Sequence, residues 1–139
     1  MLLGRWSGLF IWIYIMKLLS LSLDLELIAL RQAVMTAAGH HVTSLNTEKD
    51  ALASAESSDR YDVVLLCHRF PSATARQVVR LMRQHHPATR LVFISHMYGE
   101  WPEVEADRYI VGADGAAALL RVLDEIRTEP SSLAEIGTP

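Results

Sequence analysis

The chain has 139 residues, of which half are hydrophobic and 21% are charged, and its net charge is −3. A chain of this length forms one domain that buries roughly 70% of its unfolded surface. Its lysines and arginines are scattered, which argues against nucleic acid as a partner. The single cysteine, Cys67, excludes an internal disulfide and a Cys-x-x-Cys zinc site, and it suits a reducing cytoplasm.

Residues 1–16 differ from the rest and are predicted to be an apolar N-terminal extension. The apolar run over residues 9–16 is interrupted by Lys17, so it is far shorter than the ~20 residues of a bilayer-spanning helix. No small-x-small cleavage site of a signal peptide follows it. Met16-Lys17 resembles a second start, and residues 1–15 are interpreted as a mis-called start or a dispensable tail. We expect no membrane contact; attachment through residues 9–16 is the alternative.

Beyond Lys17 the hydrophobic period alternates between that of strands and that of helices. Residues 18–23 are predicted to form the first strand, and Asp24 stands at the N-cap of the helix that follows. This helix is predicted over residues 25–38, with Gly39 at the left-handed position after its C-terminus. The residues at three- and four-residue spacing on its predicted inward stripe are Leu27, Leu30, Val34 and Ala38.

The middle of the chain continues the alternation. Residues 41–45 are predicted to form the second strand, and Asn46 or Thr47 caps a weaker helix that continues through Ala55. Residues 63–66 are a continuous apolar run, which indicates a strand covered on both faces, as in parallel sheets. The helix opened by Pro71-Ser72 closes near His86-Pro87, and its predicted inward face consists of Val78, Val79, Leu81 and Met82.

The last third supplies two more strands and one helix. Residues 91–94 are predicted to form the fourth strand and residues 109–111 the fifth, with a connection that contains Pro102 and is too short for a full helix. The last helix is predicted over residues 114–127, and residues 128–139 are predicted to be a flexible tail. The inward residues of the last helix are Ala116, Leu119, Leu120, Leu123 and Ile126.

Five strands that alternate with helical segments predict an α/β fold, a (βα)5 doubly wound parallel sheet in one domain, residues 17–127. In such sheets, ligands and reactive groups gather at the carboxyl ends of the strands. In this chain those ends carry Ser22, Leu23, Asp24, Cys67, His68, Ser95, His96 and Gly112.

The sequence resembles a response-regulator receiver domain, the phosphoacceptor module of two-component signalling, over about residues 17–127. In YDVVLLC, Cys67 stands where the family carries its phosphoacceptor aspartate, and Pro71 follows four positions later as in the family. Ser95 matches the Thr or Ser at the end of strand four, and AAGHHV is similar to the family's passage into strand two. The resemblance implies a flavodoxin-like fold with strand order 2-1-3-4-5.

The sequence departs from the family in its chemistry. The acidic pair that holds Mg²⁺ in receivers falls on Ser22 and Leu23, and the lysine that contacts the phosphoryl group falls on Gly112. The connection from Ser95 to Gly112 is shorter than usual, so a shortened helix four is expected. Because Mg²⁺ needs hard oxygen ligands, we expect no metal, no cofactor and no aspartyl phosphorylation at this degenerate pocket.

The resemblance therefore favours a stand-alone pseudo-receiver that is not an enzyme and acts through protein contacts. The implied partners are a histidine kinase, another regulator or a second copy in a homodimer. The candidate interface is the face of the fourth and fifth strand-helix units, with Tyr98, Trp101 and Tyr109 as its aromatic residues, although packing roles for Tyr98 and Trp101 are the alternative.

Three interpretations of Cys67 remain open. It is a small apolar filler of the core, as free buried cysteines usually are, or a thiol-based redox sensor activated by His68. Adjacent strand residues point to opposite faces, so His68 need not approach the sulfur. The third interpretation is a metal sensor built from Cys67, His96 and Asp24.

Two polar features are also consistent with purely structural roles. Ser95 is either a strand-end hydroxyl that bonds the backbone or a remnant of the receiver switch residue. Four of the six histidines form adjacent pairs, which are predicted to be solvated: His40, His41, His85 and His86.

Overall fold

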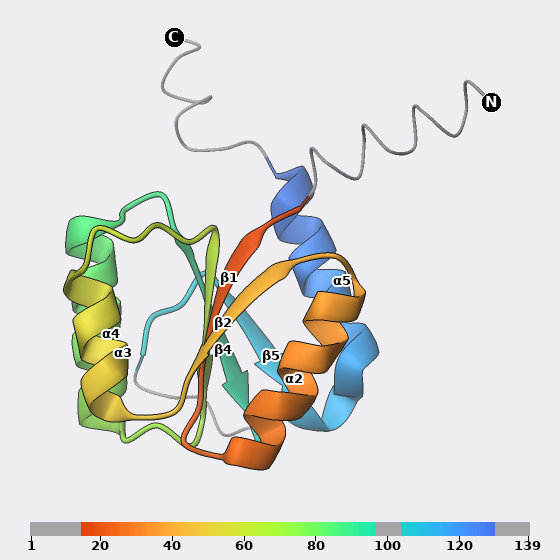
Figure 1. Cartoon of the computed structure of the whole chain (residues 1–139), viewed down its shortest axis with the longest axis horizontal. Coiled ribbons are helices and arrows are strands. Elements are labelled where there is room, and N and C mark those ends of the chain that lie inside the picture. The colour runs from red at the N-terminus through yellow and green to blue at the C-terminus, as the bar shows by residue number, and fades with distance from the viewer. Residues whose placement is uncertain (1–14, 97–103, 130–139) are drawn as a thin grey trace, which may run out of the picture.

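A computed structural model describes residues 15–96 and 104–129, and its centre is a parallel five-stranded sheet (Figure 1). The strand order is β2-β1-β3-β4-β5, as the resemblance implies. All four strand pairings are parallel, so the carboxyl ends of the strands meet at one edge. The strands are β1 (Lys17–Leu21), β2 (His41–Leu45), β3 (Val63–Cys67), β4 (Arg90–Ser95) and β5 (Arg108–Val111).

Helices cover both faces of the sheet, as the alternating pattern predicts. Figure 1 shows α3 and α4 on one side and α2 and α5 on the other. A short 3-10 turn, η1 (Gly112–Asp114), joins β5 to α5. The four α-helices of the described residues are α2 (Leu25–Ala37), α3 (Glu48–Glu56), α4 (Ser72–His85) and α5 (Gly115–Thr128).

The continuous apolar runs lie in the centre of the sheet, which confirms their interpretation as strands covered on both faces. Every residue of β3 is buried, and β4 is buried from Leu91 onward. Alternate residues serve opposite layers: Val64 and Leu66 pack under α3 and α4, whereas Val63 and Leu65 pack under α2 and α5. The first strand ends at Leu21, two residues earlier than predicted.

The two ends of α2 are built as predicted. The carboxylate of Asp24 accepts hydrogen bonds from the amides of Glu26 and Leu27, at 3.0 and 3.1 Å, and so caps the N-terminus. Gly39 has a φ of +97° after the C-terminus, where a side chain would be strained. Its amide donates to the carbonyl of Thr36 at 2.9 Å.

The predicted inward stripe of α2 is wrong. Ile28 and Met35 are the buried residues of this helix, whereas Leu30 is 61% exposed. Leu27 and Val34 are half-buried and lie beside α5, not under the helix. The sequence of α2 is apolar on several sides, so its spacing alone does not distinguish the stripe that meets the sheet from the stripe that meets α5.

The connection between β4 and β5 is held by Asp107. The Asp107 carboxylate accepts from the amide of Leu91 at 2.7 Å and pairs with the guanidinium of Arg83 at 3.1 Å. Residues 104–107 are not helical. The predicted shortening of helix four concerns residues 97–103 as well, and these lie outside the described residues.

His40 is buried at 7% exposure, which corrects the expectation that all the paired histidines are solvated. Its Nδ1 accepts a hydrogen bond from the amide of Met16 at 3.3 Å, and Met16 is itself buried. Burial and the nearby Arg127 lower the pKa of His40. The start of β1 is thereby fixed to the chain that enters β2.

Within the part of the chain that the structure describes, no helix is long and apolar enough to span a membrane. The predicted extension lies outside the described residues except for Ile15 and Met16. The predicted tail does so beyond Glu129, which forms ion pairs with Arg90 and Arg108.

Candidate functional site at the carboxyl edge of the sheet

The parallel register brings most of the predicted site residues to one edge. Cys67 is aligned with Ile94, and Ser95 is aligned with Val111, the residue before Gly112. Ser22 follows β1 directly. The sequence prediction of a shared edge is therefore confirmed for Ser22, Cys67, Ser95 and Gly112.

The residues after β1 serve the backbone. Ser22 is 1% exposed, and its hydroxyl accepts from the amide of Asp24 at 3.1 Å. The Asp24 carboxylate is engaged at the N-terminus of α2, and Leu23 is 38% exposed and carries no polar group. This end of β1 thus supplies no free carboxylate to the edge.

Cys67 is 1% exposed, and its sulfur lies 3.5 Å from Nδ1 of His68. The approach corrects the expectation from strand alternation, because the chain turns immediately after Cys67: the amide of Phe70 donates to the Cys67 carbonyl at 3.0 Å. The burial favours the interpretation of Cys67 as a core filler, since a solvent oxidant has no direct access to the thiol.

Ser95 and Gly112 end β4 and pass into η1. The Ser95 hydroxyl is buried and lies 3.5 Å from the carbonyl oxygen of Ile110, a long hydrogen bond to backbone. A Cβ on Gly112 would lie 3.2 Å from the Ser95 carbonyl oxygen and 3.5 Å from Nη2 of Arg31. The guanidinium of Arg31 therefore reaches this end of β5 from α2.

Sequence reasoning missed Arg31 and Arg69, which meet two histidines at this edge. We call the space that they enclose the edge cavity: it has a volume of about 230 Å³ and is lined by Leu27, Arg31, His68, Arg69, His96, Gly112 and Ala113. Four of the seven residues can carry positive charge and none is acidic. The sequence did contain a signal for Arg31. It lies seven residues after Asp24, and two turns of helix bring a residue at that spacing to the same side of α2 as the N-cap.

The two histidines of the edge cavity lie together, with ring centroids 5.1 Å apart. Burial lowers the pKa of His68, and the neighbouring His96, Arg69 and Arg31 lower it further. His68 is therefore neutral near pH 7, and it does not offer Cys67 a cation that would stabilise a thiolate.

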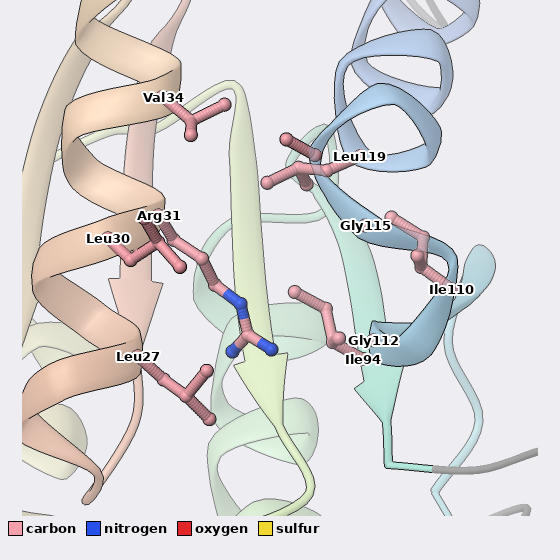
Figure 2. A pocket seen from close by; sticks show the side chains of 10 residues that line it. Leu27, Leu30, Arg31, Val34, Ile94, Ile110, Gly112, Gly115 and Leu119 are labelled. Carbon is pink, nitrogen blue, oxygen red and sulfur yellow. The ribbon is translucent and has the colours of Figure 1, made fainter.

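A second space, the interhelix cavity of about 100 Å³, adjoins the edge cavity between α2 and α5. Figure 2 shows Leu27, Leu30 and Val34 on one side of it and Leu119 on the other, with the Arg31 guanidinium pointing toward Gly112. The two cavities share Leu27, Arg31 and Gly112. An apolar recess thus opens beside the basic one.

The residues at the edge do not fit a magnesium ion. Mg²⁺ takes hard oxygen ligands, usually including one or two carboxylates, whereas the edge cavity presents guanidinium and imidazole groups. Among the described residues, no three His, Cys, Asp or Glu side chains are grouped so as to hold a metal ion. The predicted trio of Cys67, His96 and Asp24 is not assembled.

The predicted interface is described only at Tyr109, because Tyr98 and Trp101 lie outside the described residues. Tyr109 is 40% exposed. Its hydroxyl donates to the carbonyl of Val104 at 2.8 Å and accepts from the amide of Ala106 at 2.9 Å. Tyr109 therefore fastens its own connection, and the role in an interface stays a prediction.

Solved structures of receiver domains match this architecture. The receiver domain of a Pseudomonas aeruginosa sensor histidine kinase superposes with a TM-score of 0.73 at 18% identity, over 83% of this chain and 99% of that one. The chemotaxis protein CheY4 of Vibrio cholerae gives 0.68 at 21% identity, over 81% and 98%. The response regulator TrrA of Thermotoga maritima gives 0.69 at 16% identity, over 79% and 97%.

The fold is that of a response-regulator receiver domain. No protein-family model matches the sequence, and no curated protein matches it. Magnesium is coordinated in the active-site cleft of the Pseudomonas receiver domain, and TrrA was solved with magnesium and beryllofluoride. The receiver scaffold is thus shared at low identity, while the carboxyl edge of this chain carries basic groups.

Proposed function

We propose that this protein is a pseudo-receiver that acts in two-component or phosphorelay signalling through protein contacts, without enzymatic activity and without phosphorylation of its own. The observation that supports the proposal is a receiver fold in which Cys67, the residue that the resemblance aligns with the phosphoacceptor aspartate, is buried at 1% exposure. The neighbouring positions Ser22 and Leu23 bring no carboxylate to the edge. A receiver fold without a phosphoacceptor residue still has the surfaces through which it can contact other proteins.

The chemical half of the proposal is tested with acetyl phosphate and Mg²⁺, followed by intact-mass measurement. We expect no phosphoryl adduct on the wild type or on Cys67→Asp, because phosphoryl transfer also needs a cation site that neutralises charge. A receiver domain with an intact acceptor site is the positive control. A phosphoryl adduct on the wild-type protein at this edge would overturn the proposal.

The proposed partner is a histidine kinase, another regulator or a second copy of this chain. The contact face we propose consists of residues 98–109 together with α5, and exposed Tyr109 belongs to it. Affinity capture compares wild type, Trp101→Ala and Leu30→Ala, since Leu30 is an exposed leucine on α2. Loss of a signalling partner with Trp101→Ala alone supports this face; loss with Leu30→Ala alone moves the contact to α2 and contradicts it.

The thiol sensor remains as a second candidate because of the 3.5 Å contact between Cys67 Sγ and His68 Nδ1. Rates of iodoacetamide labelling measured across pH distinguish the thiol sensor from the pseudo-receiver, with Cys67→Ser as the control for background labelling. We expect slow labelling that follows opening of the fold. Fast labelling with a midpoint well below the usual thiol value of about 8.5 would favour the sensor.

A further inference from the structure

The edge cavity concentrates positive charge on a small surface. Arg31 comes from α2, His68 and Arg69 follow β3, and His96 follows β4. None of the described residues that line the cavity is acidic. The carboxylate at the N-cap of α2, Asp24, accepts from two amides of that helix, so its charge is directed to the helix N-terminus.

Arg31 is the central cation of this cluster. Its side chain is partly buried, and Nη2 lies within 3.5 Å of the position that a Gly112 Cβ would occupy. Figure 2 shows the guanidinium directed from α2 into the space next to Gly112. In the described part of the chain, no carboxylate pairs with it. A partly desolvated guanidinium is costly without a partner, and an anion compensates that cost.

The histidines extend the same field. His68 and His96 are in ring contact, and the pKa of His68 is lowered by burial first and then by His96, Arg69 and Arg31. Apart from the Cys67 thiol, which lies 3.5 Å from Nδ1 of His68, the titratable groups that face this ring from the end of β4, from its own turn and from α2 are therefore all basic. Each proton added to the cluster is opposed by its neighbours, and a bound anion would reverse that opposition.

We infer that the edge cavity is a metal-free binding site for a phosphate-type dianion, either free phosphate or the phosphate group of a small monoester. The planar forks of Arg31 and Arg69 match the geometry of phosphate oxygens, and the two imidazoles add further donors. The interhelix cavity, walled by Leu27, Leu30 and Leu119, gives the organic part of a monoester an apolar recess. This inference does not depend on the proposed signalling role.

Titration with inorganic phosphate at constant ionic strength, set with chloride, tests the site by NMR or calorimetry. We expect saturable binding that Arg31→Gln weakens by about tenfold or more, as for loss of a charge-assisted hydrogen bond. Arg80→Gln is the matched control, because Arg80 is exposed on α4 in the opposite layer. Absence of saturable binding, or equal affinity in wild type and Arg31→Gln, would overturn the inference.

A second variant keeps the test valid if Arg31→Gln fails to fold. Gly112→Ala places a methyl group in ordinary contact with Arg31 Nη2, at 3.5 Å, and tightly against the Ser95 carbonyl oxygen, at 3.2 Å, so it narrows the cavity beside the guanidinium. We expect several-fold weaker phosphate binding by a protein that still folds. Comparison of phenyl phosphate with inorganic phosphate separates the two ligand sources. If phenyl phosphate binds more tightly and Leu30→Ala removes that advantage, the interhelix cavity holds the organic part of a monoester.

Sulfate provides the pH test, because it keeps its double charge between pH 6 and 8. Binding of a dianion raises the pKa of His68 and is therefore coupled to proton uptake, so sulfate binds more tightly at pH 6 than at pH 8. The His68 ring signals report the same shift directly. Equal sulfate affinity at both pH values, with His68 signals unmoved, would contradict the participation of the histidines.

Discussion

The two helical layers that cover the sheet are built differently. The layer of α3 and α4 is closed by small residues: Ala51, Ala55 and Ala75 are all at most 1% exposed. The layer of α2 and α5 is open, with a cavity between its helices and Leu30 61% exposed beside it. Both layers bury a core against the sheet, and in the layer of α2 and α5 a recess remains between the helices.

The difference originates in the sequence at the contacts. Alanines on α3 and α4 allow the two helices to pack closely. On the other side, η1 comes between β5 and α5, and Gly115 begins α5 with a φ of +82°. The start of α5 is thereby set apart from Arg31 and Leu27, which leaves both cavities open at their shared wall.

The largest expected effect separates the buried from the exposed stripe of α2. Met35→Ala, at a residue that is 0% exposed, should lower the free energy of unfolding by about 2–5 kcal/mol because it leaves a cavity. Leu30→Ala should change it by less than about 0.5 kcal/mol, as for surface substitutions. Urea denaturation measures both. Equal losses would show that Leu30 packs in the core and that the open layer is closed.

The second prediction compares the same substitution in the two layers. Ala51→Leu overpacks the closed layer and should cost about 1–3 kcal/mol. Ala116→Leu projects into the interhelix cavity, where Ala116 is exposed, and should cost less than about 0.5 kcal/mol. Thermal and urea unfolding of the pair measure the difference. A greater loss for Ala116→Leu would contradict the assignment of closed and open layers.

Most of the architecture could be predicted from the sequence, because burial on both faces of a sheet requires a continuous apolar run that is short enough to be a strand. The runs that became β3 and β4 are examples, and Gly39 and Asp24 marked the ends of α2 through backbone requirements. The orientation of α2 could not be predicted, since a helix that contacts both the sheet and another helix has more than one apolar stripe.

The composition of the site was predicted less well than its place. The edge positions after each strand follow from topology, so Ser22, Cys67, Ser95 and Gly112 were found together. Arg31 comes from the middle of a helix, and its reach toward Gly112 depends on side-chain conformation. The contact between Cys67 and His68 depends on the turn after β3, which strand alternation does not describe.

The third prediction concerns acidification, which should loosen the open layer first. The pKa of His40 is lowered below its usual 6.5 by burial and Arg127, with opposing contributions from Asp124 and Asp62. Below pH 6.5 the unfolded chain takes up a proton that the folded chain resists, so stability falls as pH falls toward the folded-state pKa. The slope for one such group is at most about 1.4 kcal/mol per pH unit.

Denaturation at pH 7.5 and 5.5 measures this loss, and hydrogen exchange locates it. His40→Asn retains an acceptor for the Met16 amide without titrating in this range, so its stability should depend less on pH than that of the wild type. His41→Asn, at the exposed neighbour, should behave as the wild type does. If acidification removes hydrogen-exchange protection from α3 and α4 before α2 and α5, the open layer is not the one that loosens first, which contradicts this prediction.

The smallest expected effect concerns the connection that leads into β5, on the face of the sheet that α3 and α4 cover. No helix lies over β5 there among the described residues. There Val104 and Ala106 pack against the core of α3 and α4, and the Tyr109 hydroxyl bonds the backbone of both residues. Tyr109→Phe keeps the ring and removes these bonds, so the unfolding free energy should fall by about 0.5–1.5 kcal/mol. Tyr61→Phe is the control, because its hydroxyl makes no hydrogen bond within the described residues. Urea denaturation of the two variants decides whether the Tyr109 hydroxyl stabilises this connection. An unchanged unfolding free energy for Tyr109→Phe would contradict that role and leave contact with a partner as the role proposed for the exposed ring.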